Sequence, residues 1–282
     1  MPAPFRPKSD RDQPRREGAR GDAPRQTSPR RADGTLHHRP GDIDEAVLYG
    51  VHPVIEALRN PKRSHRRLLA TENGVKRLQE EIGDLPLEPE IVRPSEIDRL
   101  LTPDSVHQGL YLVCDPLPSP DLDSLPDDAI VLALDQITDP HNVGAIMRSA
   151  AAFAVKAIVT TARHSPEATG VLAKSASGAL ELVPLVTVQN LARALNELND
   201  RGFMTVGLDS EGTEDLGAVT LQQPLALVLG AEGKGLRQLT RETCSVVARL
   251  DMPGEIKSLN VSNAAVLALY IGASRLGLMK PK

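Results

Sequence analysis

The feature that most constrains the fold is a series of short apolar runs, rich in Val, Ile and Leu, that alternate with helical patterns after residue 129. The runs expected to form strands are residues 130–135, 156–161, 184–188, 203–209, 225–230 and 246–250. The helices expected between and after them are residues 143–155, 191–199 and 260–276. Uninterrupted apolar strands separated by helices are typical of a parallel sheet covered on both faces, so the sequence predicts an α/β fold. Ligands bind such sheets beyond the carboxyl ends of the strands, where we therefore expect the functional residues.

Three other segments precede this region. Residues 46–115 carry a smaller α/β pattern, with helices expected at 51–60, 72–82 and 94–101 and strands at 67–71 and 109–114. Residues 116–128 are rich in proline and turn formers, which predicts a linker. Residues 1–45 are rich in Arg, Pro and Gly and lack apolar periodicity, so we expect a disordered basic tail. That tail is equally consistent with a weak arm on nucleic acid and with a solubilising extension.

Charge is distributed unevenly along the chain. The 33 Lys and Arg against 37 Asp and Glu give a net charge of −4, and the six aromatic residues are too few for base-stacking platforms. Residues 1–40 nevertheless hold ten basic and five acidic residues, so they carry +5 and the remainder −9. The densest basic run beyond the tail contains no acid and consists of Arg59, Lys62, Arg63, Arg66 and Arg67. It is interpreted as a contact for RNA phosphates, with a solvated loop face as the alternative.

The cysteine spacing and the hydropathy of the sequence indicate the state of the thiols and the cellular location of the protein. Cys114 and Cys244 lie far apart, and no Cys or His spacing fits a zinc site, so we expect free thiols and no metal. No apolar run approaches the length of a membrane span, which predicts a cytoplasmic protein without membrane contact.

Polar clusters follow three of the predicted strands. The first, residues 139–149, contains Asn142 and Arg148; a structural ion pair with a core acid is the alternative reading of Arg148. The second, residues 230–236, is rich in glycine and carries Glu232, but its glycine order fits neither a Walker A loop nor a dinucleotide fingerprint. The third, residues 250–263, begins a helix with four polar residues, more than an N-cap requires.

Together, the three clusters resemble the motifs of the SpoU/TrmH (SPOUT) family of S-adenosylmethionine-dependent RNA ribose 2'-O-methyltransferases. The matching residues are Asn142, Gly144 and Arg148 in motif one, residues 227–233 with Gly235 and Leu236 in motif two, and Met252, Pro253 and residues 258–262 in motif three. Residues 49–52 and 106–109 resemble an L30e-like RNA-binding domain in the bacterial 23S ribosomal RNA guanosine-2'-O-methyltransferases. The resemblance covers roughly residues 47–277.

The resemblance implies a C-terminal trefoil knot within residues 129–282 and a homodimer formed partly through the C-terminal helix. It implies that S-adenosylmethionine is held by loops carrying Gly230, Leu250 and Leu259, with Asp209, Met252 and Ser258 nearby. Arg148 is then the activator of the ribose hydroxyl, and Asn142, Glu232, Ser258 and Asn260 orient it and the ribose. Because a guanidinium is effectively never deprotonated, we favour electrostatic stabilisation by Arg148 and leave its role as a base open.

Two positions depart from the family pattern. Asn263 replaces a small apolar residue, and Asp251, at a position often apolar, is expected to alter the adenine slot.

Three other functions are alternatives to methyl transfer to ribosomal RNA. Two of them are a transfer RNA guanosine-2'-O-methyltransferase and a non-catalytic RNA-binding relative. A nicotinamide oxidoreductase fits the alternation of strands and helices but not the glycine order.

Overall fold

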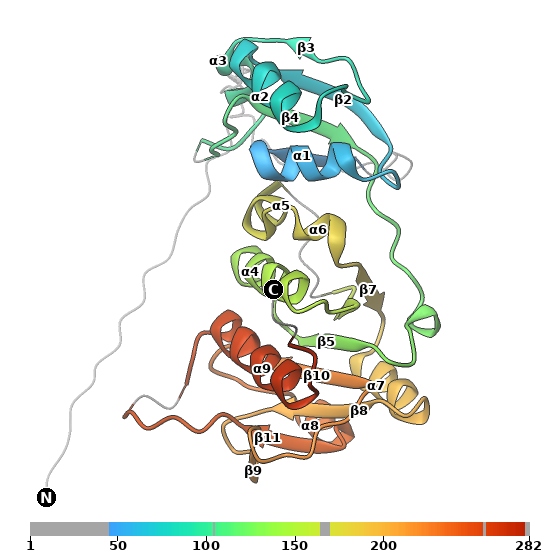
Figure 1. Cartoon of the computed structure of the whole chain (residues 1–282). Helices are drawn as coiled ribbons and strands as arrows, with labels where there is room; N and C mark the ends of the chain where they lie inside the picture. The colour runs from blue at the N-terminus through green and yellow to red at the C-terminus, as the bar shows by residue number, and fades with distance from the viewer. Residues whose placement is uncertain (1–44, 104, 164–169, 256–257, 280–282) are drawn as a thin grey trace, which may run out of the picture. The chain divides into compact units, whose positions relative to one another are not determined.

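The structure is a computed structural model that describes residues 45–103, 105–163, 170–255 and 258–279. The tail predicted for residues 1–45 lies outside the described residues except for Glu45. The strands of the described chain form one sheet of four strands and one of seven (Figure 1).

The four-stranded sheet is built from the first part of the described chain and has the order β1-β4-β2-β3. Its strands are β1 (Ala46–Tyr49), β2 (His65–Ala70), β3 (Glu90–Ile91) and β4 (Leu110–Cys114). Its helices are α1 (Val51–Arg59), α2 (Glu72–Ile82) and α3 (Pro94–Asp98). The helix expected at 72–82 is confirmed, and its start is fixed by the Thr71 hydroxyl, which accepts a hydrogen bond from Gly74 N at 3.1 Å. Strands β1 and β3 were not predicted because they are too short to show a period.

The seven-stranded sheet follows, in the order β7-β6-β5-β10-β8-β11-β9, and every neighbouring pair is parallel. Its strands are β5 (Ile130–Asp135), β6 (Ala157–Thr161), β7 (Leu185–Val188), β8 (Met204–Leu208), β9 (Glu214–Asp215), β10 (Leu225–Gly230) and β11 (Val246–Arg249). At its centre β5 pairs with β10 from Ile130 opposite Leu225 to Asp135 opposite Gly230. The predicted α/β fold with a parallel sheet is confirmed.

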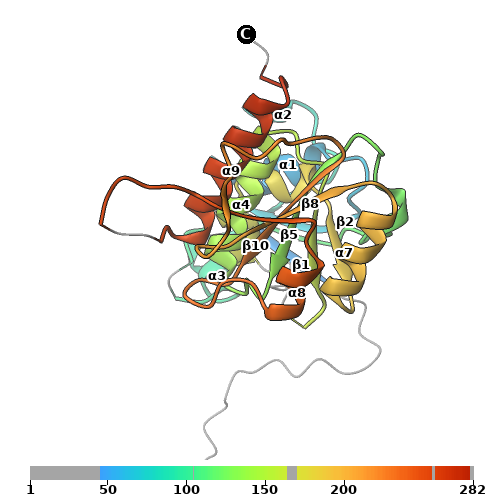
Figure 2. The same ribbon diagram turned by 90° about the horizontal axis from the view of Figure 1, so that it is seen from below.

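Helices cover both faces of this sheet. They are α4 (Pro140–Ala152), α5 (Gly170–Ala176), α6 (Ala179–Leu182), α7 (Leu191–Asp200), α8 (Gln238–Thr243) and α9 (Val261–Arg275), with a 3-10 turn η1 (Leu122–Ser124). Successive residues of β5 alternate between two apolar clusters: Leu132 packs in the cluster that contains α4 and α9, and Val131 in the cluster that contains α7. Figure 2 shows α4 and α9 side by side on one side of β5 and β10, with α7 on the other.

Helix α4 begins earlier than the residue 143 predicted from its apolar pattern. Asp139 accepts a hydrogen bond from His141 N at 3.0 Å, and Pro140 occupies the first turn, where its missing N–H costs nothing. Asn142 therefore lies in the first turn of α4 rather than before it. Gly144 then allows α5 to pack closely, because a Cβ there would lie 2.3 Å from Ser175 Cβ.

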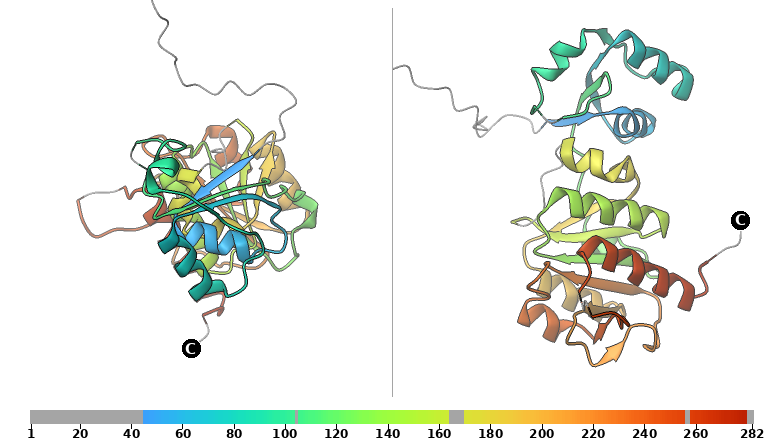
Figure 3. Two further views of the ribbon diagram at one scale, coloured as in Figure 1. Left: turned by 90° about the horizontal axis from the view of Figure 1, so that it is seen from above. Right: turned by 90° about the vertical axis from the view of Figure 1, so that its left-hand side faces the viewer.

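One continuous buried cluster joins the small sheet to the large one. Leu48 of β1 and Val54 of α1 belong to the same cluster as Leu172 of α5 and Ile146 of α4. Helix α5 contacts both β1 and α4, and it lies between α1 and α4 (Figure 3). The two halves therefore share a core in addition to the linker between them.

The predicted linker, residues 116–128, is fixed along part of its length. The Arg201 guanidinium at the end of α7 donates to Leu122 O at 2.7 Å and to Leu125 O at 2.6 Å, and it pairs with Asp127 at 3.1 Å. Ser119 Oγ accepts a hydrogen bond from Thr187 N of β7 at 2.9 Å. These contacts tie the segment to the large sheet.

Candidate functional site

A cavity of about 610 Å³ lies at the carboxyl ends of the neighbouring strands β8, β10 and β11. The predicted cofactor residues that line it are Asp209, Gly230, Leu250, Met252, Ser258 and Leu259. Glu232 lines it as well, together with the glycine-rich loop 230–235. The structure thus brings the second and third sequence clusters to one hollow, as expected for loops that follow parallel strands.

The glycine-rich loop folds back tightly on the end of β10. A Cβ on Gly230 would lie 2.2 Å from Gly235 C and 2.4 Å from Leu236 N, so only glycine allows this approach of two backbones. Gly235 has φ +65° and faces the Asp209 carboxylate, and Ala231 and Gly235 form a bridge across the loop. The backbone of the loop is consequently held at the cavity wall.

Asp209 is buried at the end of β8 and paired with Arg241 of α8. Arg241 Nη2 donates to Asp209 Oδ2 at 2.5 Å, and Arg241 Nη1 donates to Glu211 Oε2 at 3.0 Å. These hydrogen bonds, to Glu211 and then to Asp209, raise the pKa of Arg241 above its ordinary value. Arg241 and Glu211 both line the cavity, and the sequence reasoning missed both. Arg241 lies on α8, a helix of six residues that is too short to show a period, and Glu211 lies in the turn that follows β8.

Asn260 joins the first and second clusters to the third. Its Nδ2 donates to Asn142 Oδ1 at 3.0 Å and lies 3.5 Å from Glu232 Oε1. Its Oδ1 accepts from Ser262 N at 2.9 Å and from the Ser262 hydroxyl, which caps α9. One amide therefore starts the C-terminal helix and fixes Asn142 beside Glu232 at the edge of the cavity.

Arg148 lies elsewhere on α4, six residues beyond Asn142, or about 9 Å along the helix axis. Its side chain is exposed, and within the described residues no hydrogen bond or ion pair of its guanidinium is found. The alternative of an ion pair with a core acid therefore finds no support. The structure does not bring Arg148 to the group formed by Asn142, Glu232 and Asn260 in one chain.

The basic run that extends from the end of α1 into β2 has acidic partners that lie outside residues 59–67. Arg59 pairs with Glu56 and Glu81, Arg66 with Asp115 and Glu45, and Arg67 with Glu90. The hydrogen bonds of these pairs raise the pKa of Arg66 and Arg67. Lys62 is exposed, and none of the ion pairs found among the described residues includes it.

Arg63 differs from the prediction that it contacts RNA. Its side chain is 1% exposed and paired with Glu181 of α6, so it offers no surface to a phosphate in this structure. The physical reason is tertiary: the acid that neutralises it lies 118 residues further along the chain.

Residues 49–52 and 106–109, which resemble the L30e-like domain, have structural roles. Gln108 Oε1 accepts a hydrogen bond from Val51 N at 3.2 Å, at the start of α1. Gly109 has φ +82°, and a Cβ there would lie 2.3 Å from the Thr71 hydroxyl. His107 Nδ1 accepts from Gly109 N at 3.0 Å, and its Nε2 lies 3.1 Å from Asp98. Residues 49–52 and 106–109 therefore support each other at one edge of the small sheet.

The two positions that depart from the family pattern lie outside the cavity lining. Asp251 forms a fork with Arg249, at 2.7 Å from Nε and 3.2 Å from Nη2, and this contact raises the pKa of Arg249. Asn263 is exposed on α9. Neither is among the residues that line the cavity, so the expected change in an adenine slot has no direct basis in this geometry.

Neither a metal-ligand cluster nor a membrane-spanning helix occurs among the described residues. Across residues 45–279, apart from the gaps named above, no group of three or more His, Cys, Asp or Glu side chains is arranged to hold a metal ion. In the same part of the chain, no helix has the length and apolar character needed to span a membrane.

Comparison with known proteins gives two family matches that together cover most of the described chain. The model of the SpoU rRNA Methylase family matches residues 129–270, and the model of RNA 2'-O ribose methyltransferase substrate binding matches residues 47–120. The chain is 37% identical over 232 residues to the 23S rRNA (guanosine-2'-O-)-methyltransferase RlmB of Ralstonia nicotianae, covering 79% of this chain and 93% of that protein. It is 35% identical to the putative TrmH family tRNA/rRNA methyltransferase YacO of Bacillus subtilis, with 79% and 93% covered.

A solved structure resembles the described fold. The SpoU methyltransferase AviRb from Streptomyces viridochromogenes, in complex with the cofactor AdoMet, has a TM-score of 0.71 and 25% sequence identity. The similarity covers 82% of this chain and 90% of AviRb. With one family model spanning half of the sequence and relatives matched over nearly their whole length, the chain belongs to the SpoU rRNA Methylase family.

Proposed function

We propose that this protein transfers a methyl group from S-adenosylmethionine to the ribose 2'-hydroxyl of a guanosine in 23S ribosomal RNA. The observation that carries the proposal is the cavity beyond β8, β10 and β11, with the hydrogen-bonded group of Asn142, Glu232 and Asn260 at its edge. Family membership and the names of the Ralstonia and Streptomyces proteins support the reaction and the methyl donor.

The cavity suits a nucleoside-sized cofactor. Its volume of about 610 Å³ falls within the usual range of ligand sites, roughly 300–1,000 Å³. Leu250, Met252 and Leu259 offer apolar surface for an adenine ring, and the loop at Gly230 offers backbone groups for its edge. Asp209, held by Arg241, is the carboxylate we assign to the polar part of the cofactor. We further propose that the C-terminal segment forms a trefoil knot, as the family resemblance implies, and that this knot holds the loops of the cavity together.

The residues around the cavity have to position and activate a weak nucleophile. S-adenosylmethionine supplies the methyl group on a cationic sulfur. We assign to Asn142, Glu232, Ser258 and Asn260 the orientation of the ribose, because orientation in a water-poor site supplies up to about 7–11 kcal/mol in favourable cases. Because Arg148 does not reach this group within one chain, we assign its role across the proposed homodimer. There Arg148 of one protomer stabilises the negative charge that develops on the 2'-oxygen at its partner's cavity and contacts the neighbouring phosphate, a role that needs no deprotonation of its guanidinium.

A homodimer packed through α9 is the second part of the proposal. Val266 and Tyr270 are one turn apart on α9 and are 40% and 53% exposed, and Leu278 and Met279 beyond it are exposed as well. An exposed apolar face of this kind is typical of a protein interface. Helix α4 packs beside α9, so Arg148 lies on a helix adjacent to the proposed interface.

For the RNA, we propose contact through the exposed cations Arg59, Lys62, Arg66 and Arg67, without Arg63. Their ion pairs are partly or fully exposed, and such pairs contribute only about 0–1 kcal/mol, so RNA phosphates can replace the acidic partners at low cost. The name of the Bacillus relative keeps transfer RNA as a second candidate substrate.

The reaction is tested by Arg148→Ala. The variant should lose methyl transfer to 23S RNA from a strain that lacks the modification, while S-adenosylmethionine binding by calorimetry and the dimer by light scattering remain as in the wild type. The matched control is Arg193→Ala, which removes an exposed arginine from a different helix, α7, and should keep full activity. Wild-type turnover by Arg148→Ala would refute the assignment.

The substrate is tested by the same labelled-methyl assay with ribosomal and transfer RNA, followed by mapping of the modified nucleotide. Labelling of a guanosine in 23S RNA alone is the expected result. Labelling of transfer RNA alone would refute ribosomal RNA as the substrate and support transfer RNA instead. The absence of both labelling and S-adenosylmethionine binding would favour a non-catalytic RNA-binding protein.

A further inference from the structure

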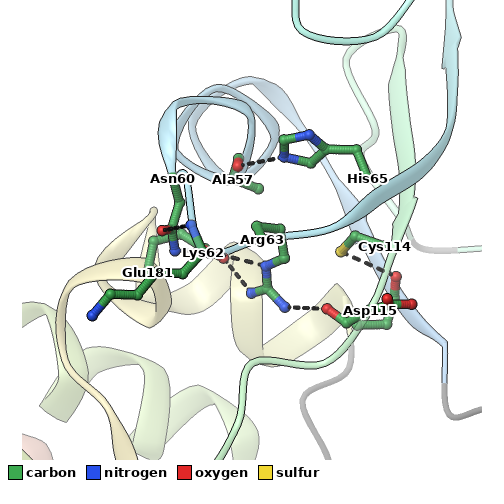
Figure 4. A network of polar contacts seen from close by, with 9 residues as sticks. Ala57, Asn60, Lys62, Arg63, His65, Cys114, Asp115 and Glu181 are labelled. Atoms are coloured by element: carbon green, nitrogen blue, oxygen red, sulfur yellow. Dashed lines mark hydrogen bonds and ion pairs between the residues drawn. The ribbon is translucent and has the colours of Figure 1, made fainter.

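A buried ion pair joins the small sheet to the large one. Arg63 lies in the turn between α1 and β2, and Glu181 lies on α6 (Figure 4). Their side chains are 1% and 3% exposed, and the guanidinium meets the carboxylate with two parallel N–H groups, Nε to Oε2 at 3.2 Å and Nη2 to Oε1. Fork-shaped pairs of this kind are geometrically specific as well as strong.

The remaining hydrogen-bonding groups of the pair are also used. Asn60 Nδ2 donates to Glu181 Oε2 at 2.7 Å, and Arg63 Nη1 donates to Asp115 O at 2.8 Å, at the end of β4 (Figure 4). A buried charge without a partner is costly, so this carboxylate and this guanidinium favour the arrangement in which they meet. We call the group formed by Asn60, Arg63 and Glu181 the latch.

Close packing surrounds the latch. Gly178, between α5 and α6, has φ +88°, and a Cβ there would lie 2.4 Å from Glu56 Cγ of α1. The Lys174 ammonium of α5 lies 5.8 Å from the centre of the Tyr49 ring of β1. The small sheet therefore packs on α5 and α6 through complementary shape as well as charge, and the ion pair of the latch is buried within this contact.

The covalent link alone would not fix this position. Residues 116–128 span about 43 Å when extended, and the part before the Ser119 contact with β7, residues 116–118, still spans about 10 Å. RNA held by a small sheet that was tethered by the linker alone would therefore meet the cavity over a range of distances and orientations. A fixed position of the small sheet raises the effective concentration of the target ribose at the cavity.

We propose that the latch is a positioning device: Asn60, Arg63 and Glu181 fix the RNA-binding small sheet relative to the methyl-transfer cavity and thereby determine how efficiently the target nucleotide reaches it. This inference rests on the proposed function for its catalytic consequence. Its structural part, a latch-dependent position of the small sheet, holds whatever the reaction is.

The test compares Glu181→Gln with Glu90→Gln in the full-length protein. Glu90 pairs with Arg67 through an equally forked contact, but both side chains are more than half exposed and both lie in the small sheet. The two variants therefore remove the same charge from the same kind of pair, one across the contact between the sheets and one away from it.

Two readouts are measured for both variants. The first is the distance distribution between spin labels at Arg77→Cys on α2 and Arg193→Cys on α7, in a background where Cys114 and Cys244 are replaced. The second is the KM for 23S RNA and the kcat of methyl transfer, together with S-adenosylmethionine affinity. Glu181→Gln should broaden the distance distribution and raise the KM for RNA by about tenfold, while kcat at saturating RNA and cofactor affinity change much less. Glu90→Gln should leave the distance distribution narrow and should not raise the KM, because it frees Arg67, a proposed RNA contact, from its acidic partner.

Three outcomes overturn the inference: a narrow distribution in folded Glu181→Gln, equal changes in KM for Glu181→Gln and Glu90→Gln, or a loss confined to kcat. If Glu181→Gln does not fold, Asn60→Ala is measured instead, because it removes one hydrogen bond of the latch and leaves the ion pair. A wild type without methyl transfer would refute the proposed function, and the distance measurement would still decide whether the latch fixes the small sheet.

Discussion

The closest approach of two backbone segments at the cavity makes Gly230→Ala a sharp test of the site. The new Cβ would lie 2.2 Å from Gly235 C and 2.4 Å from both Gly235 O and Leu236 N. All three contacts are with backbone atoms, so no side chain can rotate away, and the loop 231–235 has to move by about 1 Å or more to restore van der Waals distances. Overpacking of this kind costs about 1–3 kcal/mol, and we expect a loss of free energy of unfolding at the upper end of that range.

The same displacement moves the loop that lines the cavity. We therefore expect Gly230→Ala to lower the affinity for S-adenosylmethionine by more than about tenfold, because one face of the cavity no longer matches its ligand. In a protein of this size, each kcal/mol lowers the Tm by about 2–4 °C, so a loss of about 3 kcal/mol should lower the Tm by about 6–12 °C. Urea unfolding followed by circular dichroism measures the first effect, and calorimetry with S-adenosylmethionine measures the second.

Gly272→Ala on α9 is the matched control. A Cβ there meets only Leu225 Cδ2, at an ordinary 3.6 Å, and alanine is favoured over glycine in a helix by about 1 kcal/mol. The control should be as stable as the wild type or more stable, with unchanged cofactor affinity. If Gly230→Ala unfolds at the same urea concentration as the wild type and binds the cofactor equally well, the tight return of the loop onto β10 is not a feature of the folded protein.

Two further predictions follow from the site and from the thiols. Asn260→Ala and Asn190→Ala each remove a helix cap and should each lower the free energy of unfolding by about 1 kcal/mol, but only Asn260→Ala should also abolish methyl transfer; equal activities of the two variants would contradict the role of Asn260. Burial raises the pKa of Cys114 to about 11 and that of Cys244 to about 12, so both thiols stay protonated in the fold where the unfolded chain ionises. Stability should therefore fall as the pH rises from about 9 towards 11–12, less so in a variant with both cysteines replaced by alanine, and a parallel loss in that variant would show that other groups are responsible.

The sequence predicts the bounds of an element correctly where the apolar pattern of that element alone determines them. Residues 130–135 and 225–230 are apolar throughout because both faces of their strands are covered, and the structure has β5 and β10 at those bounds. Helices α5, α6 and α8 were missed because they have seven residues or fewer, too few to show a helical period. The start of α4 was misplaced because capping by Asp139, and not an apolar period, determines it.

The candidate site divides in the same way. Residues directly after strands were predicted to meet, and Gly230 and Leu250 do line one cavity, because parallel strands end at the same edge. The bond from Asn260 to Asn142 spans 118 residues and depends on the packing of α9 against α4. No local pattern records that contact, although four polar residues at the head of an apolar helix indicated that more than a cap was needed.

The basic run shows why a charge count along the sequence misjudges a surface. Within residues 59–67 there is no acid, yet Arg63 has its carboxylate at Glu181, and Arg66 has one at Asp115. Folding thus converts one of the five cations into a buried structural group and leaves Lys62 as the cation of the run without an ion pair among the described residues. A variant that replaces Arg63 together with its neighbours would therefore combine the loss of an interior contact with the loss of surface charge. Replacement of Lys62 and Arg67 alone separates RNA affinity from the position of the small sheet, because both side chains are exposed and neither belongs to the latch.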